Sequence, residues 1–216
     1  VNMPSISAEL LAKIKPYLAL GESMGKLVSQ LIDGGIKSIH VQYNGEVANL
    51  KVDPITITVL KGIFAQTVDG VNMVNAPFIA KERGVEVKES KTNETYEYTS
   101  AIRVLVKAEK GEREISGSLS GKGAPHLIRI DDFYIEAGFS KYMLIVTNND
   151  VPKVIGNIGN ILGDNNINIA GFHLGRLSEK GGKAISIINI DSAPTDKALD
   201  ELRRAKNVLD VRSVTL

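Results

Sequence analysis

Two groups of Asn and Asp residues flank a glycine-spaced apolar segment, Val151 to Asp164. Asn148, Asn149 and Asp150 come directly before this segment, and Asn168 follows it. Amide and carboxylate oxygens accept hydrogen bonds from ammonium and hydroxyl groups. If the segment is a helix, the free backbone N–H groups at its start favour a carboxylate. These groups would therefore suit a small zwitterion better than a nucleotide.

The predicted site combines the side chains of Asn148, Asp150 and Asn168 with the backbone N–H groups of Val154 and Ile155. In a strand–helix–strand unit the helix returns across the sheet, so Asn148 and Asn168 of one copy would be distant. Two copies related by a two-fold axis would bring the strand-end loop of one against the strand start of the other. A plainer interpretation stays open, in which these residues only cap a helix and form turns.

Two glycine patterns imitate nucleotide-binding loops, and neither is complete. Gly156, Gly159 and Gly163 never form G-x-G-x-x-G, and they lie inside the predicted helix. Because each glycine costs about 1 kcal/mol against Ala in a helix interior, we expect close packing at these positions. The segment from Gly117 to Gly123 is one residue short of a P-loop, and Gly123 replaces the Ser or Thr that holds magnesium. A hairpin loop is the better interpretation there.

The overall composition excludes several kinds of chemistry. The 216 residues include no cysteine and three widely spaced histidines, so we expect no disulfide, thiol catalysis or metal site. No complete catalytic group is present, and no cofactor site is expected in this chain. A net charge of +1 gives no support for nucleic-acid binding, and no apolar run approaches the roughly 20 residues of a membrane span. We therefore expect a soluble, cytoplasmic protein without nucleic-acid or membrane partners.

From residue 140 onwards, apolar periodicity predicts the elements that would position the Asn and Asp residues. Strands are expected at residues 142–148, 167–177, 183–191 and 208–216, and helices at residues 151–164 and 195–205. The sequence Glu-Lys-Gly-Gly at residues 179–182 predicts a hairpin turn. The order βαββαβ is that of a ferredoxin-like domain, which we place at residues 140–216.

Residues 1–139 predict a separate α+β domain with a largely antiparallel sheet. Helices are expected at residues 7–32, 54–66 and 71–83. Strands are expected at residues 36–45, 85–90, 99–110, 112–121, 126–131 and 133–137. Pro16 is expected to kink the first helix or divide it in two. Asn44 and Gly45 form a turn-type pair, so the first strand is expected to end in a hairpin.

Residues 144–176, LIVTNNDVPKVIGNIGNILGDNNINIAGFHLGR, resemble the ACT domain, the amino-acid-sensing module of biosynthetic enzymes. The matching parts are the N-x-D-x-P start, the apolar helix and the I-N-I-A-G strand. Residues 1–31 and 71–87, the latter VNMVNAPFIAKERGVEV, resemble the C-terminal region of long D-3-phosphoglycerate dehydrogenases. In that family an intervening allosteric-substrate-binding domain precedes the ACT domain, so the resemblance covers both predicted domains.

The resemblance implies an effector and the residues that hold it. Asn148, Asp150 and Asn168 match the family's serine-contacting positions, which face each other across an ACT–ACT interface. It therefore implies L-serine or a similar small amino acid as the ligand, and self-association through ACT domains. The family's Arg-Pro-Gly at the helix start is Val151-Pro152-Lys153 here. Because Lys153 lacks the close backbone approach that glycine allows, we expect weaker binding than in Arg-Pro-Gly relatives.

The resemblance also implies a second ligand. Some members of the family bind an anion or a phosphorylated substrate in the intervening domain, with basic residues on strands. Lys122, His126 and Arg129 come nearest to that pattern and form the predicted anion site, with a phosphorylated hydroxy acid as a candidate ligand. A solvated basic strand face is the alternative interpretation.

The family's Rossmann fingerprint and its catalytic Arg, Glu and His lie N-terminal to anything in this sequence. The resemblance thus implies that the parent protein is an NAD-dependent oxidoreductase of L-serine biosynthesis and that this chain is its regulatory and oligomerisation half. Val1 is not an initiator Met, which also leads us to expect a piece of a longer protein. Two other hypotheses stay open: a stand-alone amino-acid-binding ACT module, and the regulatory part of an L-serine dehydratase.

Overall fold

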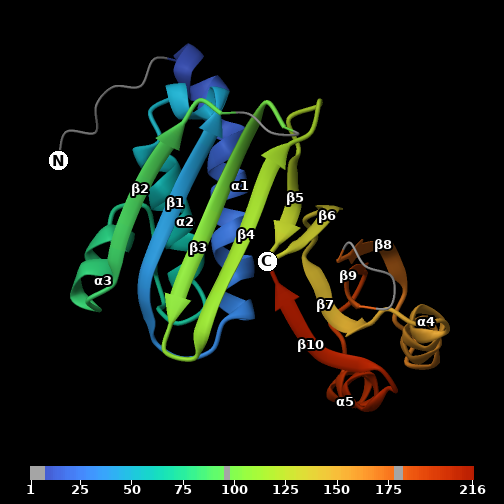
Figure 1. The fold of residues 1–216 in the computed structure, drawn as a ribbon. Helices are drawn as coiled ribbons and strands as arrows, with labels where there is room; N and C mark the ends of the chain where they lie inside the picture. The colour runs from blue at the N-terminus through green and yellow to red at the C-terminus, as the bar shows by residue number, and fades with distance from the viewer. Residues whose placement is uncertain (1–7, 95–97, 178–181) are drawn as a thin grey trace. The chain divides into compact units, whose positions relative to one another are not determined.

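The computed structural model describes residues 8–94, 98–177 and 182–216 (Figure 1). The chain divides into two compact units, Val1–His126 (unit 1) and Leu127–Leu216 (unit 2). Helices and largely antiparallel sheets occur in both, which confirms the predicted α+β class. The turn predicted at residues 179–182 lies almost entirely outside the described residues.

Unit 1 packs helices against one face of a sheet. Its helices are α1 (Ala8–Leu31), α2 (Asp53–Phe64), α3 (Ala76–Glu82) and the short 3-10 helix η1 (Glu46–Asn49). Its strands are β1 (Ile36–Gly45), β2 (Glu86–Thr92), β3 (Ser100–Ala108) and β4 (Gly111–Leu119). Within the unit their order is β2-β1-β3-β4; β1 and β2 run parallel, and the other neighbours are antiparallel.

The core of unit 1 lies between this sheet and the helices α1 and α2, which cover the same face (Figure 1). Ile39, Val41 and Tyr43 alternate along β1 and are fully buried, because successive strand residues point to opposite faces. The two helices lie very close together. A Cβ added at Gly25 of α1 would be 2.2 Å from the carbonyl oxygen of Val59 in α2. Glycine is therefore required where the two backbones meet.

One prediction about the chain path in unit 1 is narrowed by the structure, and one differs from it. Of the two alternatives predicted at Pro16, a kink or a division, the division does not occur, because α1 continues through that residue. The hairpin predicted after β1 is wrong. Gly45, with φ 73°, leads into η1, and β1 pairs with β2 and β3 instead. The turn-type pair Asn44 and Gly45 therefore ends the strand but does not connect it to a hairpin partner.

The third helix of unit 1 is shorter than predicted. It begins at Ala76, whereas the apolar periodicity placed its start at residue 71. The Oδ1 atom of Asn72 accepts hydrogen bonds from the backbone N–H groups of Val74 (2.8 Å) and Asn75 (3.1 Å). These local bonds form a turn and keep the preceding residues out of the helix.

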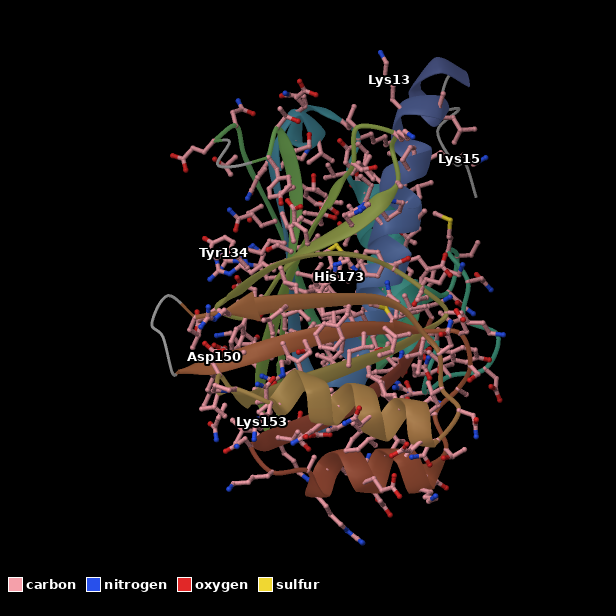
Figure 2. The ribbon with its side chains drawn as sticks, turned by 90° about the vertical axis from the view of Figure 1, so that its right-hand side faces the viewer. Lys13, Lys15, Tyr134, Asp150, Lys153 and His173 are labelled. Carbon is pink, nitrogen blue, oxygen red and sulfur yellow. The ribbon has the colours of Figure 1, made fainter. Side chains whose placement is uncertain are left out.

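Unit 2 contains the predicted βαββαβ domain. Its strands are β7 (Tyr142–Asn149), β8 (Ile169–Arg176), β9 (Lys183–Ile190) and β10 (Val208–Thr215), in the antiparallel order β10-β7-β9-β8. Its helices are α4 (Val154–Asp164) and α5 (Asp196–Arg204). Both helices lie on one side of the sheet (Figure 2). Leu144, Ile158 and Leu202 are fully buried there, in one apolar cluster.

Two strands precede this sheet, β5 (Pro125–Ile130) and β6 (Phe133–Gly138). β6 packs against β8: the carbonyl oxygen of Tyr134 lies 2.6 Å from a Cβ added at Gly175. This close contact gives a physical reason for the compact unit to begin at Leu127, although the sequence places the domain boundary at residues 139 and 140.

The helix glycines of unit 2 are not closely packed within the chain. A Cβ added at Gly156, Gly159 or Gly163 would have no atom of the described residues within 4 Å beyond the local backbone. The packing expected at these positions is therefore wrong for the single chain. α4 has an open face instead, next to Ile155, whose side chain is 44% exposed.

Candidate functional site

The start of α4 carries the backbone part of the predicted site. Figure 2 shows Asp150 and Lys153 at this end of the helix. Lys153 immediately precedes α4 with φ 77° and ψ −12°, a left-handed conformation that favours glycine. Its side chain makes no capping hydrogen bond, so the first backbone N–H groups, including those of Val154 and Ile155, lack a cap from it. An anion is favoured at such a helix start.

Asn148 supplies a buried polar group beside this helix. It is 3% exposed, near the end of β7. Its Nδ2 donates to the backbone carbonyl of Asn149 at 2.8 Å. Its Oδ1 is buried and has no hydrogen-bond partner among the described residues. Because an unpaired buried acceptor costs about 1–3 kcal/mol, this atom is available to a hydrogen-bond donor from a ligand.

Ser186 is a second buried polar residue, which the sequence patterns did not single out. It lies opposite Val146, while Asn148 lies opposite Ala184, so Ser186 and Asn148 are diagonal neighbours on one face. That face is covered by the helices, because Val146 belongs to the apolar cluster beneath them. Ser186 is fully buried, and its Oγ has no partner among the described residues. The available signal was one Ser inside the apolar run from Ala184 to Ile188 of β9.

Asp150 is ion-paired with Arg176, the last residue of β8. The Nε of Arg176 donates to Oδ2 of Asp150 at 2.7 Å, and Nη2 donates to the same oxygen. Arg176 lies opposite Ala184, and Ala184 lies opposite Asn148, so the arginine and Asn148 share one row of the sheet. The sequence predicts that Asp150 is one of the side chains that bind the ligand. The structure gives this carboxylate a cationic partner within the chain.

Asn168 lies at the other end of the sheet. It directly precedes Ile169, which lies in the same row as Tyr142 at the start of β7, whereas Asn148 is near the end of β7. Asn168 is exposed, and its Nδ2 donates to Oδ2 of Asp191 at 2.6 Å. The two asparagines are therefore apart within one chain, as the strand–helix–strand geometry requires.

The structure does not gather the basic groups of the predicted anion site at one point. Lys122 is exposed in the turn before β5. His126 and Arg129 are three residues apart in β5, so their side chains leave opposite faces of the strand. Arg129 lies 3.6 Å from the carboxylate of Asp132, and its guanidinium carbon lies 5.3 Å from the centre of the Tyr134 ring. The anion site stays a prediction.

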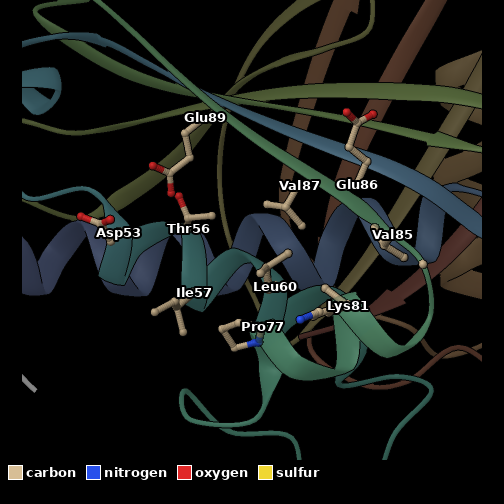
Figure 3. Close-up of a pocket in the computed structure, with 12 residues that line it drawn as sticks. Asp53, Thr56, Ile57, Leu60, Pro77, Lys81, Val85, Glu86, Val87 and Glu89 are labelled. Carbon is tan, nitrogen blue, oxygen red and sulfur yellow. The ribbon is translucent and has the colours of Figure 1, made fainter. Parts of the chain in front are cut away.

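Unit 1 contains a groove of about 540 Å³ between α2, α3 and β2 (Figure 3). Its lining includes the buried side chains of Leu60 and Thr56, and the Thr56 hydroxyl lies 2.7 Å from the Tyr43 hydroxyl. Burial raises the pKa of Tyr43; the hydrogen bond with Thr56 opposes this, and the charges of Glu89 and Asp53 raise the pKa further. The groove thus combines apolar lining with the charged side chains of Asp53, Lys81, Glu86 and Glu89, which no sequence pattern indicated.

Two further findings concern the described part of the chain. No group of three or more His, Asp and Glu residues within it is arranged to hold a metal ion. None of the helices described there is both long enough and apolar enough to cross a membrane.

Comparison with known proteins defines the class first. The ACT-domain family model matches residues 142–207, so unit 2 contains an ACT domain. The family model of the D-3-phosphoglycerate dehydrogenase intervening domain matches residues 13–131. The chain belongs to the D-3-phosphoglycerate dehydrogenase family and contains its intervening and ACT domains. The predicted resemblance is confirmed; the domain boundary at residues 139 and 140 falls between the two matches and stays a prediction.

Curated relatives agree with this assignment. The D-3-phosphoglycerate dehydrogenase of Methanocaldococcus jannaschii is 34% identical over 217 residues, which cover 100% of this chain and 41% of the relative. Those of Synechocystis sp. and Bacillus subtilis are each 33% identical, covering 100% of this chain and 39% and 41% of the relatives. The chain therefore spans about two fifths of the length of these relatives.

Proposed function

We propose that this chain is the regulatory and oligomerisation half of an NAD-dependent D-3-phosphoglycerate dehydrogenase. L-serine, or a similar small amino acid, binds between two of its ACT domains and exerts feedback control of L-serine biosynthesis in the cytoplasm. The chain itself binds no cofactor in this proposal, and NAD belongs to the remainder of the parent enzyme. Membership of the family supports the assignment to a D-3-phosphoglycerate dehydrogenase, and the uncapped start of α4 supports a ligand with a carboxylate.

One observation carries the ligand-binding part of the proposal. The Lys153 side chain does not cap α4. Asn148 lies near the end of β7, on the face that the helices cover, and its buried Oδ1 has no partner among the described residues. The helix start favours the carboxylate of an amino acid. Asp150 offers a carboxylate to the ammonium group, and an Asn amide accepts or donates at the hydroxyl group of serine.

Three features support a site shared by two copies. Asn168 matches a serine-contacting position of the family, yet it lies at the far end of the sheet from Asn148 in one chain. β8 is an end strand of the four-stranded sheet, and no strand of the described residues pairs with its outer edge, so a second chain could pair there. The glycine face of α4 is open as well, beside the exposed Ile155. A second copy would cover these groups and bring its own Asn168 to the first copy's Asn148.

Calorimetric titration of the chain with L-serine, L-alanine and glycine tests the proposal, together with sedimentation analysis of its oligomeric state. We expect a dimer or larger assembly that prefers L-serine. Asn168→Ala should weaken serine binding about ten- to a hundredfold, because polar groups of the ligand lose their partner. Asn93→Ala, in an exposed loop of unit 1, is the control and should leave the affinity unchanged. A monomeric chain, or equal affinity for serine and alanine, would contradict the shared site.

A further inference from the structure

The ion pair between Asp150 and Arg176 stands where the ammonium group of the ligand is expected. Both guanidinium donors of Arg176 that reach Asp150 bind the same oxygen, Oδ2. The Asp150 side chain is 17% exposed, whereas that of Arg176 is 51% exposed. The carboxylate is thus held near the surface of the domain, and the arginine that neutralises it remains accessible to solvent.

Arg176 is also placed toward the remaining binding groups. It shares a sheet row with Asn148, whose buried Oδ1 has no partner among the described residues. Asp150 lies four positions before the first residue of α4. The cationic side chain, the unpaired amide oxygen and the positive end of the helix therefore belong to one polar region at the ends of β7 and β8.

We propose that Arg176 binds the carboxylate of the effector, and that the Asp150–Arg176 pair exchanges partners with a zwitterion; this inference rests on the proposed effector site. On binding, the ligand's ammonium group replaces the guanidinium at Asp150. The released guanidinium receives the ligand's carboxylate, next to the helix start. No bond is formed or broken covalently, and the site stays neutral before and after binding.

The exchange makes the site selective for molecules with both charges. A ligand with an ammonium group alone would displace Arg176 and leave this cation without a counter-ion. A ligand with a carboxylate alone would do the same to Asp150. Leaving a charged group unpaired at a partly buried site costs more than losing a neutral hydrogen bond. A zwitterion pays neither penalty, because it supplies a partner for each side chain.

The initial pair is weak enough to open. An ion pair with one solvent-accessible partner is only weakly stabilising, since water already stabilises the charge of the exposed side chain. Arg176 is half exposed and lies at a strand end, so its side chain can turn from Asp150 to a ligand without disturbing the apolar cluster. The planar guanidinium also matches the geometry of a carboxylate, which a lysine ammonium does not.

Three ligands with one hydroxymethyl group test this selectivity on the full chain: L-serine, L-serinamide and 3-hydroxypropionate. Binding is measured by calorimetry at a pH below the ordinary pKa of an α-amino group, so that serinamide is a cation. The wild-type chain should bind L-serine at least about tenfold more tightly than either ligand with a single charge, since each leaves one ion unpaired.

Arg176→Gln is the decisive variant. It should weaken L-serine binding about ten- to a hundredfold, while serinamide binds as tightly as before or more tightly, because Asp150 no longer has a competing cation. Arg176→Lys should keep part of the preference for serine, since it keeps the charge and loses the fork. Arg203→Gln is the matched control: Arg203 is also 51% exposed and paired with an Asp, Asp200, but it lies on α5. It should change neither affinity.

The outcomes separate this inference from the proposed function. If L-serine does not bind to the wild-type chain at all, the effector site itself is wrong, and the role of Arg176 is overturned with it. If L-serine binds, but Arg176→Gln keeps the wild-type ratio of serine to serinamide affinity, the effector site stands and the exchange is overturned. A loss of both affinities in equal proportion would likewise show a structural role for Arg176 and overturn the exchange.

Discussion

Glycines inside helices have opposite surroundings in the two units. In unit 1, a Cβ added at Gly25 would be 2.2 Å from the carbonyl oxygen of Val59, and one at Gly62 would be 2.4 Å from that of Glu22. In unit 2, a Cβ added at Gly159 would have nothing within 4 Å beyond the local backbone, and the same holds for the other glycines of α4. The same residue type is thus required by packing in one region and left open in the other.

The difference indicates which helix surfaces are packed within one chain and which are not. A helix glycine costs about 1 kcal/mol against Ala unless its small size is used. In unit 1 the close approach of α1 and α2 uses it within a single chain. In unit 2 the three glycines of α4 follow the spacing of one helix face, and none of the residues that the structure describes packs against them. The proposed ACT–ACT association would place a second surface on that face.

The largest effect is expected on the buried face of α4, opposite to its glycines. Leu162 is fully buried in the apolar cluster of unit 2. Leu162→Ala should lower the free energy of unfolding by about 2–5 kcal/mol, because it removes buried methyl groups and leaves a cavity. Urea denaturation followed by circular dichroism measures this change. A loss below 1 kcal/mol would mean that the cluster is not the core of this domain.

A smaller loss is expected at the helix contact of unit 1. Gly62→Ala places a methyl group 2.4 Å from a backbone oxygen, and neither backbone can yield as a flexible side chain would. We expect a loss of about 1–3 kcal/mol from overpacking, measured in the same denaturation experiment. Gly121→Ala, at a glycine with open surroundings and without a left-handed backbone, tests the alternative that any substitution of a glycine is harmful in unit 1. If Gly62→Ala is as stable as the wild-type chain, close packing does not require glycine in unit 1, and the difference between the two units is wrong.

The regular parts of the fold could be predicted from the sequence because periodicity reports burial. The helix at Val154–Asp164 and the strands on either side of it follow directly from which residues are apolar. The same periodicity placed the start of α3 too early. The side chain of Asn72 accepts two backbone hydrogen bonds, so the chain forms a turn there and the helix begins only at Ala76. The turn-type pair Asn44 and Gly45 could not predict that β1 pairs with β2, a strand far along the chain, because that pairing does not depend on local residues.

The candidate site was predictable in part, for a different reason. Asn148 and Asp150 stand beside a recognisable helix start, so their residue types and spacing already suggested a polar ligand. Arg176 and Ser186 come from other strands, and only the register of the sheet brings them to the same region. The sequence shows which residues are polar, but it does not show which residues of different strands lie opposite each other in the sheet. Long-range pairing therefore supplied the part that local patterns could not.

Gly159→Ala addresses the open face of α4 directly. In the isolated chain this change should raise the free energy of unfolding by about 1 kcal/mol, because Ala favours the helix and meets no obstacle. If a second copy packs on this face, the added methyl group should also weaken self-association. Denaturation at low concentration and sedimentation over a concentration range measure the two effects separately. Increased stability with unchanged association would show that the open face of α4 is not the contact between copies.

The smallest effect is expected at Lys153, whose left-handed backbone (φ 77°) positions the start of α4. Lys153→Gly removes a conformational cost of about 1–2 kcal/mol for an L-residue, and the greater freedom of glycine in the unfolded chain offsets about 0.4–1 kcal/mol of this gain. We expect a net stabilisation of roughly 0.5 kcal/mol, with tighter serine binding because the ligand can approach the backbone more closely. Lys197→Gly, in the first turn of α5, has the same chemical change at a helical position and should destabilise instead. If both variants lose stability equally, the left-handed backbone of Lys153 carries no conformational strain. The start of α4 would then differ from the helix contact of unit 1, where glycine is required by close packing.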